Sequence, residues 1–501
     1  VLSGIDRYIH DVSRRLVESR PDTVQSVLTV WNLLPWRETL LSVESVVTIP
    51  KDADGGSISL LSGDTPVDVD VVSRWEHDGF YSEMENAPNW IPSVSYRIVF
   101  ELPFDGMQAR SLVVQPATGP VHTTLRPGGF HISNEALVLT GRPDGTFELR
   151  DRRSGVVLHD ALCVIEEQDD GDSYTAVPAQ PQRLQLECLT EAEIGSHIQR
   201  ISARYSASGG GSVELFCALR RGEPVLRVRA VIDNRSTNRR YQIRLRLPQH
   251  AEEHYSDTPF DMVRRTNQRD RFHWTAPRTE APESSAPTAS FVWSGGITLL
   301  HDGLHEYEFA PGPAEASEDL PGVDGAIYLT LLRGTGMLSK GSLPNRGGGA
   351  GPHIATPEGQ CLGTFTAELA IAMCERREAP ALARRFLQPA ISHQGTLPIA
   401  ETCPISLDNR QLIMSACYRM DDRLRLLRLW NSGDETEQGM LRFPAPVTYC
   451  EITLEEERAY RSGGSPSTDR PSNWSTKPSR DVRVQLAPKQ IYTIMYEEAT
   501  L

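Results

Sequence analysis

The feature that most constrains the fold is a two-residue alternation of apolar and polar side chains that recurs along the chain. In "YQIRLRLP" (241–248), a tyrosine, an isoleucine and two leucines alternate with a glutamine and two arginines. The segments "SYRIVFELP" (95–103) and "PVLRVRAVIDN" (224–234) alternate in the same way. Successive side chains of a strand point to opposite faces, so these segments are predicted to be half-buried strands.

Turn residues and two helical patterns complete the local prediction. Glycine and proline, 38 and 35 residues, separate short segments from end to end, which is typical of antiparallel sandwiches. The stretch "NEALVLTGRPDGTFELRDRRSG" (134–155) predicts a meander with an Asp-Gly turn. Segments 422–431 and 482–498 read as strands of a small terminal sandwich. Apolar residues at helical spacing predict a helix within 1–21, and a shorter helix is expected at 379–387.

Size and charge narrow the functional classes. At about 150 residues per domain, 501 residues suggest about three domains. The net charge of −15 argues against nucleic-acid or anionic-membrane partners and is compatible with a neutral ligand such as a sugar. No apolar run reaches about 18 residues and no signal pattern is present, so we expect a cytoplasmic protein. Because the chain begins at Val1 within a helical pattern, we expect it to be part of a longer polypeptide.

The eight cysteines are spread along the chain without a CxxC pair. A chain of this size does not need disulfides to stabilise a core. We therefore expect reduced, mostly buried thiols.

Two histidine pairs have the spacing of zinc ligands. "HAEEH" matches an inverted zinc-protease pattern, in which His250 and His254 would share one face of a helix. The motif follows an alternating strand and Pro248, so a structural role is the simpler interpretation. His301 and His305 repeat the spacing, but a glycine lies between them and strand-like sequence follows. The same interpretation applies to that pair.

The glycine-rich stretch "NRGGGAGPHIATPEGQ" (345–360) invites comparison with a phosphate-binding loop. It lacks the lysine and the Ser/Thr of such a loop, and no βαβ unit surrounds it, so it does not predict nucleotide binding. The glycines leave open a pocket-lining surface or a mobile loop.

Acidic side chains offer weaker candidates. The pairs Asp257 with Asp261 and Glu306 with Glu308 could act on glycosidic bonds, although two acids in a loop or strand are usually only solvated. Tyr174 follows the acidic turn of "DDGDSY", where a phenol could hydrogen-bond a sugar hydroxyl. The residues alone therefore predict a multi-sandwich protein without a self-sufficient catalytic group.

Nine blocks, in order, resemble the C-terminal half of glycoside hydrolase family 38, the zinc-dependent retaining α-mannosidases, in their bacterial cytosolic branch. The blocks are "VWNLLPWRETLLSV", "NEALVLTGRPDGTFELRDRRSG", "DDGDSYTAVP", "VIDNRSTNRRYQIRLRLP", "HYSDTPFDMVRR", "GLHEYEF", "YLTLLRGTGMLS", "RGGGAGPHIATPEGQCLGTF" and "LAPKQIYTI". The resemblance covers nearly the whole chain.

The resemblance implies an all-β fold with several sandwiches, preceded by a short helix. It places a helix from a helical bundle at 1–21, a small β domain at 22–120, a large galactose-mutarotase-like sandwich at 121–400 and a small sandwich at 401–501. In the family, zinc, its histidine and aspartate ligands and the aspartate nucleophile lie in an N-terminal domain. None of those motifs occurs here, so we expect neither catalytic nor metal-binding residues in this chain and zinc only in the full-length enzyme.

The resemblance also implies which side chains contact sugar. The "GDSY" block aligns Tyr174 with a tyrosine that the family places against mannose, and Asp172 belongs to the same block. The corresponding arginine is either Arg346 or Arg333, and we prefer Arg346 because its glycine neighbours permit close approach of a ligand. These four residues are the candidate substrate-binding set.

Three functions follow, in order of preference. The first is the C-terminal region of an α-mannosidase that completes the sugar site of its own N-terminal catalytic domain, with an α-mannoside or oligosaccharide as substrate. The second is a free-standing carbohydrate-binding sandwich that uses some of the eight tryptophans as platforms. The third is a sugar epimerase with, for example, His254 and Glu358 as acid and base. No nucleic acid or membrane is expected as a partner, and a homo-oligomer is left open.

Overall fold

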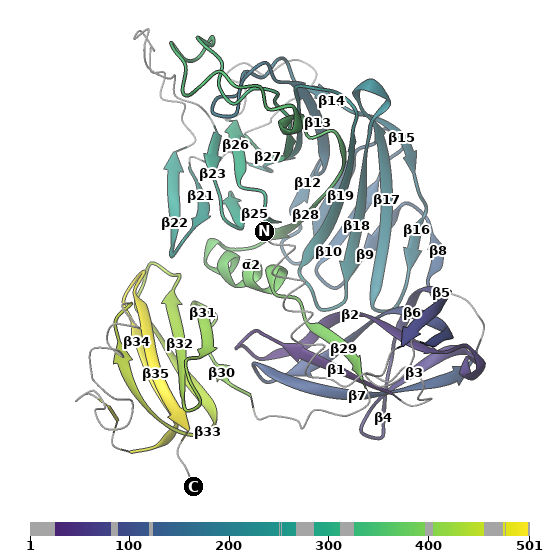
Figure 1. Ribbon diagram of the computed structural model, residues 1–501, viewed down its shortest axis with the longest axis vertical. Helices are drawn as coiled ribbons and strands as arrows, with labels where there is room; N and C mark the ends of the chain where they lie inside the picture. Colours follow the sequence, from purple (N-terminus) through teal and green to yellow (C-terminus); the bar gives the residue numbers. More distant parts are fainter. Residues whose placement is uncertain are drawn as a thin grey trace. The chain divides into compact units, whose positions relative to one another are not determined.

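The computed structural model describes most of the 501-residue chain, and by its internal contacts the chain divides into two compact units (Figure 1). Unit 1 combines Val1–Leu125 with Pro380–Leu501, and unit 2 is Arg126–Ala379. The described residues are 26–81, 89–119, 124–249, 251, 253–266, 285–310, 325–395, 404–454, 474–475 and 477–498. The helix predicted within 1–21 lies outside them. The domain boundaries expected from the sequence stay a prediction.

Unit 1 begins with two sheets that enclose one apolar core. A five-stranded sheet has the order β29-β1-β7-β3-β4, and a three-stranded sheet has the order β2-β6-β5. Val30, Val43 and Phe100 are among the fully buried residues between them. The elements are β1 (Ser26–Asn32), β2 (Glu38–Pro50), η1 (Lys51–Ala53), β3 (Gly56–Ser62), β4 (Thr65–Val67), β5 (Asp70–Tyr81), β6 (Asn89–Phe104), β7 (Gln108–Thr118) and β29 (Ile391–Gly395).

The rest of unit 1 is a six-stranded sheet with its own core. Its order is β30-β33-β35-β32-β31, with β34 on β33. The helix predicted at 379–387 is present as α2 (Ala379–Leu387), which contributes Ala381 to this core. The strands are β30 (Ser406–Leu407), β31 (Leu412–Arg419), β32 (Leu424–Asn431), β33 (Glu437–Ile452), β34 (Ser479–Leu486) and β35 (Ile491–Glu498).

Unit 2 is built from sheets of six, eleven and four strands that share one large core. The six-stranded sheet has the order β14-β13-β20-β27-β26-β23, and the eleven-stranded sheet includes the meander β19-β18-β17-β16. The elements are β8 (Arg126–Gly128), β9 (His131–Ser133), β10 (Leu137–Gly141), β11 (Phe147–Asp151), β12 (Val157–Leu158), β13 (Cys163–Gln168), β14 (Gln182–Arg183), β15 (Gln185–Leu189), β16 (Ala192–Ile194), β17 (Ile198–Ser206), η2 (Ser208–Gly210), β18 (Ser212–Arg220), β19 (Val225–Asn234), β20 (Arg239–Arg246), β21 (Glu253–Thr258), β22 (Asp261–Thr266), β23 (Ser285–Pro287), β24 (Phe291–Ser294), β25 (Ile297–Asp302), β26 (Glu306–Ala310), β27 (Ala326–Arg333), η3 (Pro357–Gln360), β28 (Gly363–Met373) and η4 (Arg376–Glu378).

The predicted all-β class is confirmed, and the alternating segment 241–248 shows how the pattern works. Tyr241, Ile243 and Leu245 of β20 are fully buried in the core of unit 2. The opposite face was expected to be solvated, yet Gln242 is also fully buried and its amide nitrogen donates to Thr330 Oγ1 at 3.3 Å. A buried polar side chain needs such a partner. The outer face of β20 is therefore polar and partly covered.

The predicted meander at 134–155 is also confirmed. Strands β10 and β11 pair antiparallel, with Gly141 opposite Phe147. Between them, the backbone amide of Thr146 donates to Asp144 Oδ1 at 2.9 Å, and Gly145 has φ of 81°. That conformation is natural for glycine and strained for other residues.

Candidate functional site

Strand pairing brings two loops to one edge of the six-stranded sheet in unit 2. Strands β13 and β27 both pair antiparallel with β20, so they run in the same direction and end opposite its first residues. Gln168 lies opposite Arg239, and Arg333 lies opposite Arg240. The loop after β13 begins at Asp169, and the loop after β27 contains the glycine-rich stretch. The topology therefore places all four candidate residues in neighbouring segments.

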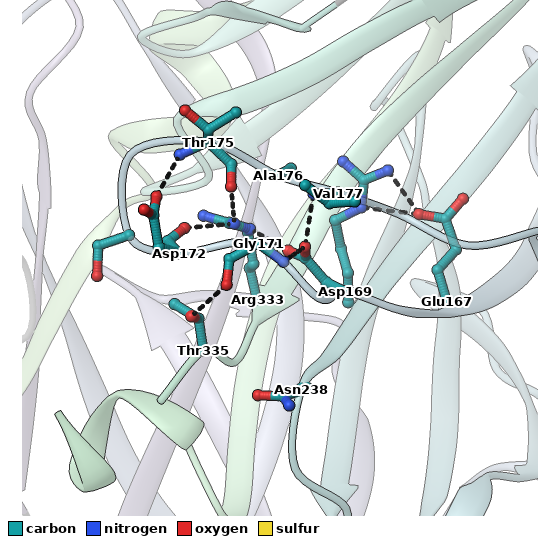
Figure 2. Close-up of polar contacts among 12 residues, drawn as sticks. Glu167, Asp169, Gly171, Asp172, Thr175, Ala176, Val177, Asn238, Arg333 and Thr335 are labelled. Carbon is teal, nitrogen blue, oxygen red and sulfur yellow. Dashed lines mark hydrogen bonds and ion pairs between the residues drawn. The ribbon is translucent and has the colours of Figure 1, made fainter. Parts of the chain in front are cut away.

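Asp169 fixes the start of the first loop. Its Oδ1 accepts hydrogen bonds from the backbone amides of Gly171 (2.9 Å) and Val177 (2.8 Å), and its Oδ2 accepts one from Arg333 Nε at 2.6 Å. Burial alone would raise the pKa of Asp169, but the Arg333 charge and the hydrogen bonds outweigh it and lower the pKa. The carboxylate is fully buried and stays ionised. Figure 2 shows these groups gathered around Arg333.

Asp172 is the second buried carboxylate and accepts five hydrogen bonds. Oδ1 accepts the backbone amides of Tyr174 (3.0 Å) and Thr175 (2.9 Å) and Nη1 of Arg346 (3.2 Å). Oδ2 accepts the backbone amide of Lys340 (2.6 Å) and Nη2 of Arg346 (2.5 Å). Burial would raise the pKa of Asp172, but these bonds, with that of Arg346 first, hold it well below its usual range. Asp172 thus joins the two loops.

Every N–H donor of the Arg346 guanidinium is hydrogen-bonded within the protein. Nε donates to the carbonyl of Gly348 at 2.8 Å. Nη1 donates to Asp172 and, at 2.6 Å, to Thr175 Oγ1, while Nη2 donates to Asp172 and, at 3.3 Å, to the carbonyl of Lys340. A guanidinium carries five N–H bonds, and all five have acceptors here. The residue is 6% exposed. In this conformation it orders the loops and has no spare donor for a ligand.

Arg333 differs from Arg346 in this respect. Its Nε binds Asp169, and its Nη2 donates to the carbonyl oxygens of Asp172 (2.6 Å) and Thr175 (3.3 Å). Its Nη1 makes no hydrogen bond to any residue that the structure describes and is not closed off from solvent. The side chain is 15% exposed. Of the two candidate arginines, Arg333 therefore keeps donors for a ligand.

Tyr174 is the solvent-exposed member of the cluster. Its backbone amide is held by Asp172, whereas the residue is 56% exposed. A Cβ built on Gly351 would lie 3.2 Å from the Tyr174 hydroxyl oxygen and 3.3 Å from its ring. Ser339 Oγ accepts the backbone amides of Ala350 (3.1 Å) and Gly351 (3.2 Å), which anchors the glycine-rich loop beside that ring. The loop is thus a fixed surface under an exposed phenol.

A further buried charge network adjoins this site. Arg240 is 1% exposed, and its Nε and Nη2 donate to Glu167 Oε2 at 2.8 and 2.5 Å. Its Nη1 donates to Glu308, and Glu306 lies 3.8 Å away. Burial would lower the pKa of Arg240, but Glu308 and Glu167 raise it. The pair Glu306 and Glu308, expected to be solvated, instead neutralises this arginine in part. Figure 2 shows Glu167 next to Asp169 along the chain.

The comparisons with known proteins identify the fold. No family model and no curated protein matches the chain. An α-mannosidase from Enterococcus faecalis V583 matches with a TM-score of 0.70 and 15% identity over 97% of this chain and 58% of that one. A glycosyl hydrolase family 38 protein from Enterococcus faecalis matches with a TM-score of 0.69 and 16% identity over 97% of this chain and 60% of that one.

This chain has the fold of part of these family 38 structures. The resemblance predicted from the sequence is thereby confirmed at the level of the fold. The chain spans less than two thirds of the length of either structure. Within the shared family 38 fold, the described loops of this chain hold Tyr174, Asp172, Arg333 and Arg346 in one hydrogen-bonded cluster.

His254 and His301, one from each histidine pair, are buried and contact neighbouring side chains. His254 lies in strand β21, stacked on Phe309 with ring centroids 4.7 Å apart, and is 4% exposed; His250 is outside the described residues. His301 Nε2 lies 3.1 Å from Thr288 Oγ1, and burial lowers the pKa of His301 to about 3. Across the described ranges, no group of three His, Cys, Asp or Glu side chains is placed to hold a metal ion. Glu358, the suggested partner of His254, lies exposed in η3.

The remaining predictions concern acids, cysteines, tryptophans and membranes. Asp257 accepts a hydrogen bond from Ser290 Oγ, and Asp261 accepts the amide of Met262 at 2.7 Å. The seven described cysteines are free thiols, and Cys403 lies outside the described residues. Trp90 is 66% exposed. In the part of the chain that the structure describes, no helix has the length and hydropathy to span a bilayer.

Sequence reasoning missed the residues that build the cluster. Asp169, Thr175 and Ser339 lie within the quoted blocks but were not among the candidate residues, although each takes part in hydrogen bonds that hold the cluster. One signal was present: "DDGDSYT" alternates carboxylates with small residues before a turn, and buried carboxylates at such turns accept backbone amides. Gly351 lies in the glycine-rich stretch, but the sequence does not show why glycine is needed at this position, because the constraint comes from Tyr174, far away in sequence.

Proposed function

We propose that this chain is a β-rich part of a family 38 α-mannosidase and that it supplies sugar-contacting side chains to a site whose bond-breaking residues lie elsewhere. The observation that carries the proposal is the likeness over 97% of the chain to an α-mannosidase structure. The acidic charge and the exposed phenol on a fixed loop support a neutral hydroxyl-bearing ligand. With its free thiols, the protein fits a reducing compartment, so we place it in the cytoplasm.

Within this proposal the four residues have different roles. Tyr174 contacts the sugar, because its ring and hydroxyl are exposed while its backbone is held. Arg333 donates from Nη1, the atom that the protein leaves unpaired among the described residues. Arg346 and Asp172 are positioning residues, because their hydrogen-bonding capacity is spent on each other and on the two loops. The sequence-based preference for Arg346 as the sugar contact is therefore reversed in the proposal.

Zinc enters the proposal only through residues outside this chain. The described part has no cluster able to hold it, so no step is assigned to zinc bound here. In the resembled family the metal binds sugar hydroxyls and supports a double displacement at an aspartate. The role left to this chain is to bind and orient the sugar ring.

Substitution of Tyr174 tests the proposal. Tyr174→Phe removes one hydroxyl and keeps the ring against Gly351. In the longest polypeptide encoded by the same reading frame, we expect kcat/KM on an aryl α-mannoside to fall about 2- to 10-fold, as for loss of one neutral hydrogen bond worth about 0.5–1.5 kcal/mol. Tyr418→Phe, at a tyrosine 45% exposed in unit 1, is the matched control. Equal activity of both variants and the parent would contradict the role of Tyr174.

A second candidate function is sugar binding without hydrolysis, both in this chain and in the longest polypeptide of its reading frame. Its specific support is Trp90, an exposed tryptophan of the kind that sugar-binding modules present as a platform. Calorimetric titration of the 501-residue chain with methyl α-mannoside tests it. A Kd that weakens on Trp90→Ala, together with no hydrolysis by the longest polypeptide, would favour this function over the first.

A further inference from the structure

A polar hollow of about 350 Å³ lies in unit 2, away from the candidate site. It is bordered by the turns after β9, before β17 and after β18. Strand β17 runs from this hollow to Ser206, close to Ser208, which donates to Glu166 beside the candidate site. Nine strand residues span about 25–30 Å, so the two sites lie near opposite ends of β17. Its lining includes Asn134, Glu135, Ile198, Gln199, Leu219 and Arg221.

The three turns are fixed to one another before any ligand arrives. Asn134 Nδ2 donates to the carbonyls of Arg220 and Glu223, both at 2.8 Å, and its Oδ1 accepts two backbone amides of its own turn. The amide of Arg221 donates to the carbonyl of His197 at 3.0 Å. Hydrogen bonds that join all three turns preorganise the hollow, which lowers the entropy cost of binding.

The rim of the hollow also carries polar atoms that take no part in the hydrogen bonds joining the three turns. Gln199 Oε1 accepts the amide of Ser133 at 2.7 Å, whereas its Nε2 has no partner among the described residues. Arg221 Nε lies 3.7 Å from Glu135 Oε1, and neither Nη atom has a partner in the described part of the chain. Glu135 Oε2 accepts one amide, from Gly222 at 3.3 Å. Gln199 Nε2 and the two Nη atoms of Arg221 together carry six N–H bonds, more than a single water could accept, and a carboxylate lies beside them.

Charge and size restrict the ligand. The guanidinium of Arg221 and the carboxylate of Glu135 cancel, so the rim favours neither an anion nor a cation. Ile198 and Leu219, 5% and 1% exposed, form an apolar base. No tryptophan, tyrosine or phenylalanine is among the nine lining residues, which gives no platform for a planar aromatic ligand. A volume of 350 Å³ is at the small end of ligand sites.

We propose that this hollow, bounded by Glu135, Gln199 and Arg221, binds a neutral, hydroxyl-rich molecule of about one sugar residue. Hydroxyl oxygens accept hydrogen bonds from Gln199 Nε2 and Arg221 Nη, and a hydroxyl hydrogen is donated to Glu135. The site is separate from the Tyr174 cluster and does not depend on the function proposed for it.

Ligand-observed NMR on the 501-residue chain with methyl α-mannoside tests the proposal. Gln199→Glu keeps the acceptor that holds Ser133 and replaces the free donor with oxygen. Arg221→Gln removes the guanidinium and keeps the backbone bond to His197. We expect each variant to weaken binding by at least about fivefold, the loss for one or two hydrogen bonds of about 1 kcal/mol each, with an unchanged thermal midpoint.

Two controls separate the sites. Glu187→Gln acts on an exposed ion pair, in which Arg204 Nε lies 3.1 Å from Glu187 Oε2 in the same sheet but outside the hollow. It should leave binding unchanged, whereas Tyr174→Phe changes only the binding that belongs to the Tyr174 cluster. Absence of saturable binding, binding lost only in Tyr174→Phe, or preferential Arg221-dependent binding of inorganic phosphate would each overturn the proposal.

Discussion

Unit 2 contains two carboxylate–arginine pairs that differ in burial and in how completely they are hydrogen-bonded. Asp172 and Arg346 have side chains 0% and 7% exposed and complete each other's hydrogen bonds. Glu135 and Arg221 have side chains 62% and 49% exposed and are only 3.7 Å neighbours. Burial makes the first pair part of the framework, because an unpaired buried charge is costly. Exposure leaves the second pair free to exchange partners with a ligand.

The largest expected effect separates the two pairs by stability. Asp172→Ala leaves the buried Arg346 guanidinium without its main acceptor, so we expect the free energy of unfolding to fall by about 3–5 kcal/mol. Glu135→Gln, at an exposed pair, should change it by less than about 0.5 kcal/mol. Urea denaturation of the two variants and the parent chain measures both. Similar losses of unfolding free energy in the two variants would contradict the view that only the buried pair is part of the framework.

A glycine beside the buried pair gives the next largest effect. A Cβ on Gly171 would lie 2.1 Å from the backbone oxygen of Thr175, inside the loop that Asp169 and Asp172 hold together. We expect Gly171→Ala to cost about 2–3 kcal/mol, as overpacking against backbone does. Gly129 is the matched control, because a Cβ there would meet only His131 Nδ1, at 3.8 Å. Gly129→Ala should be close to neutral by thermal denaturation; an equal loss at both glycines would contradict the tight loop.

A smaller effect concerns pH. The folded-state pKa values of Asp169 and Asp172 lie below the unfolded value of about 3.9. Their ionised forms therefore contribute stability that is present above that unfolded value and is lost as pH falls through the folded pKa. We expect the free energy of unfolding to decline below about pH 4, and Asp172→Asn to decline less steeply. Denaturant midpoints from pH 3 to 7 check this; parallel curves would show that Asp172 is not ionised and paired.

Local patterns predicted much of the fold because strand alternation is a local signal. The buried face of β20, the Asp144–Gly145 turn and helix α2 all follow from neighbouring residues. Long-range pairings do not: nothing in 391–395 indicates that β29 pairs with β1. The burial of Gln242 was missed for the same reason, because alternation shows that a face is polar but not that it is covered.

In the candidate site, too, some features could be predicted from the sequence and others depend on residues that are distant in it. The resemblance located the two loops, and the structure joins Tyr174, Asp172, Arg333 and Arg346 through them. Glycine neighbours favoured Arg346 as the sugar contact, but the number of acceptors around a guanidinium depends on residues distant in sequence. That number is what distinguishes Arg346 from Arg333.

The role proposed for this chain is tested by comparing the hydrolysis of an aryl α-mannoside by the 501-residue chain and by the longest polypeptide encoded in its reading frame. We expect activity only in the longer polypeptide and a loss of about 2- to 10-fold in its Tyr174→Phe variant. Activity in the 501-residue chain alone, or a longer polypeptide that is active and indifferent to Tyr174→Phe, would contradict it.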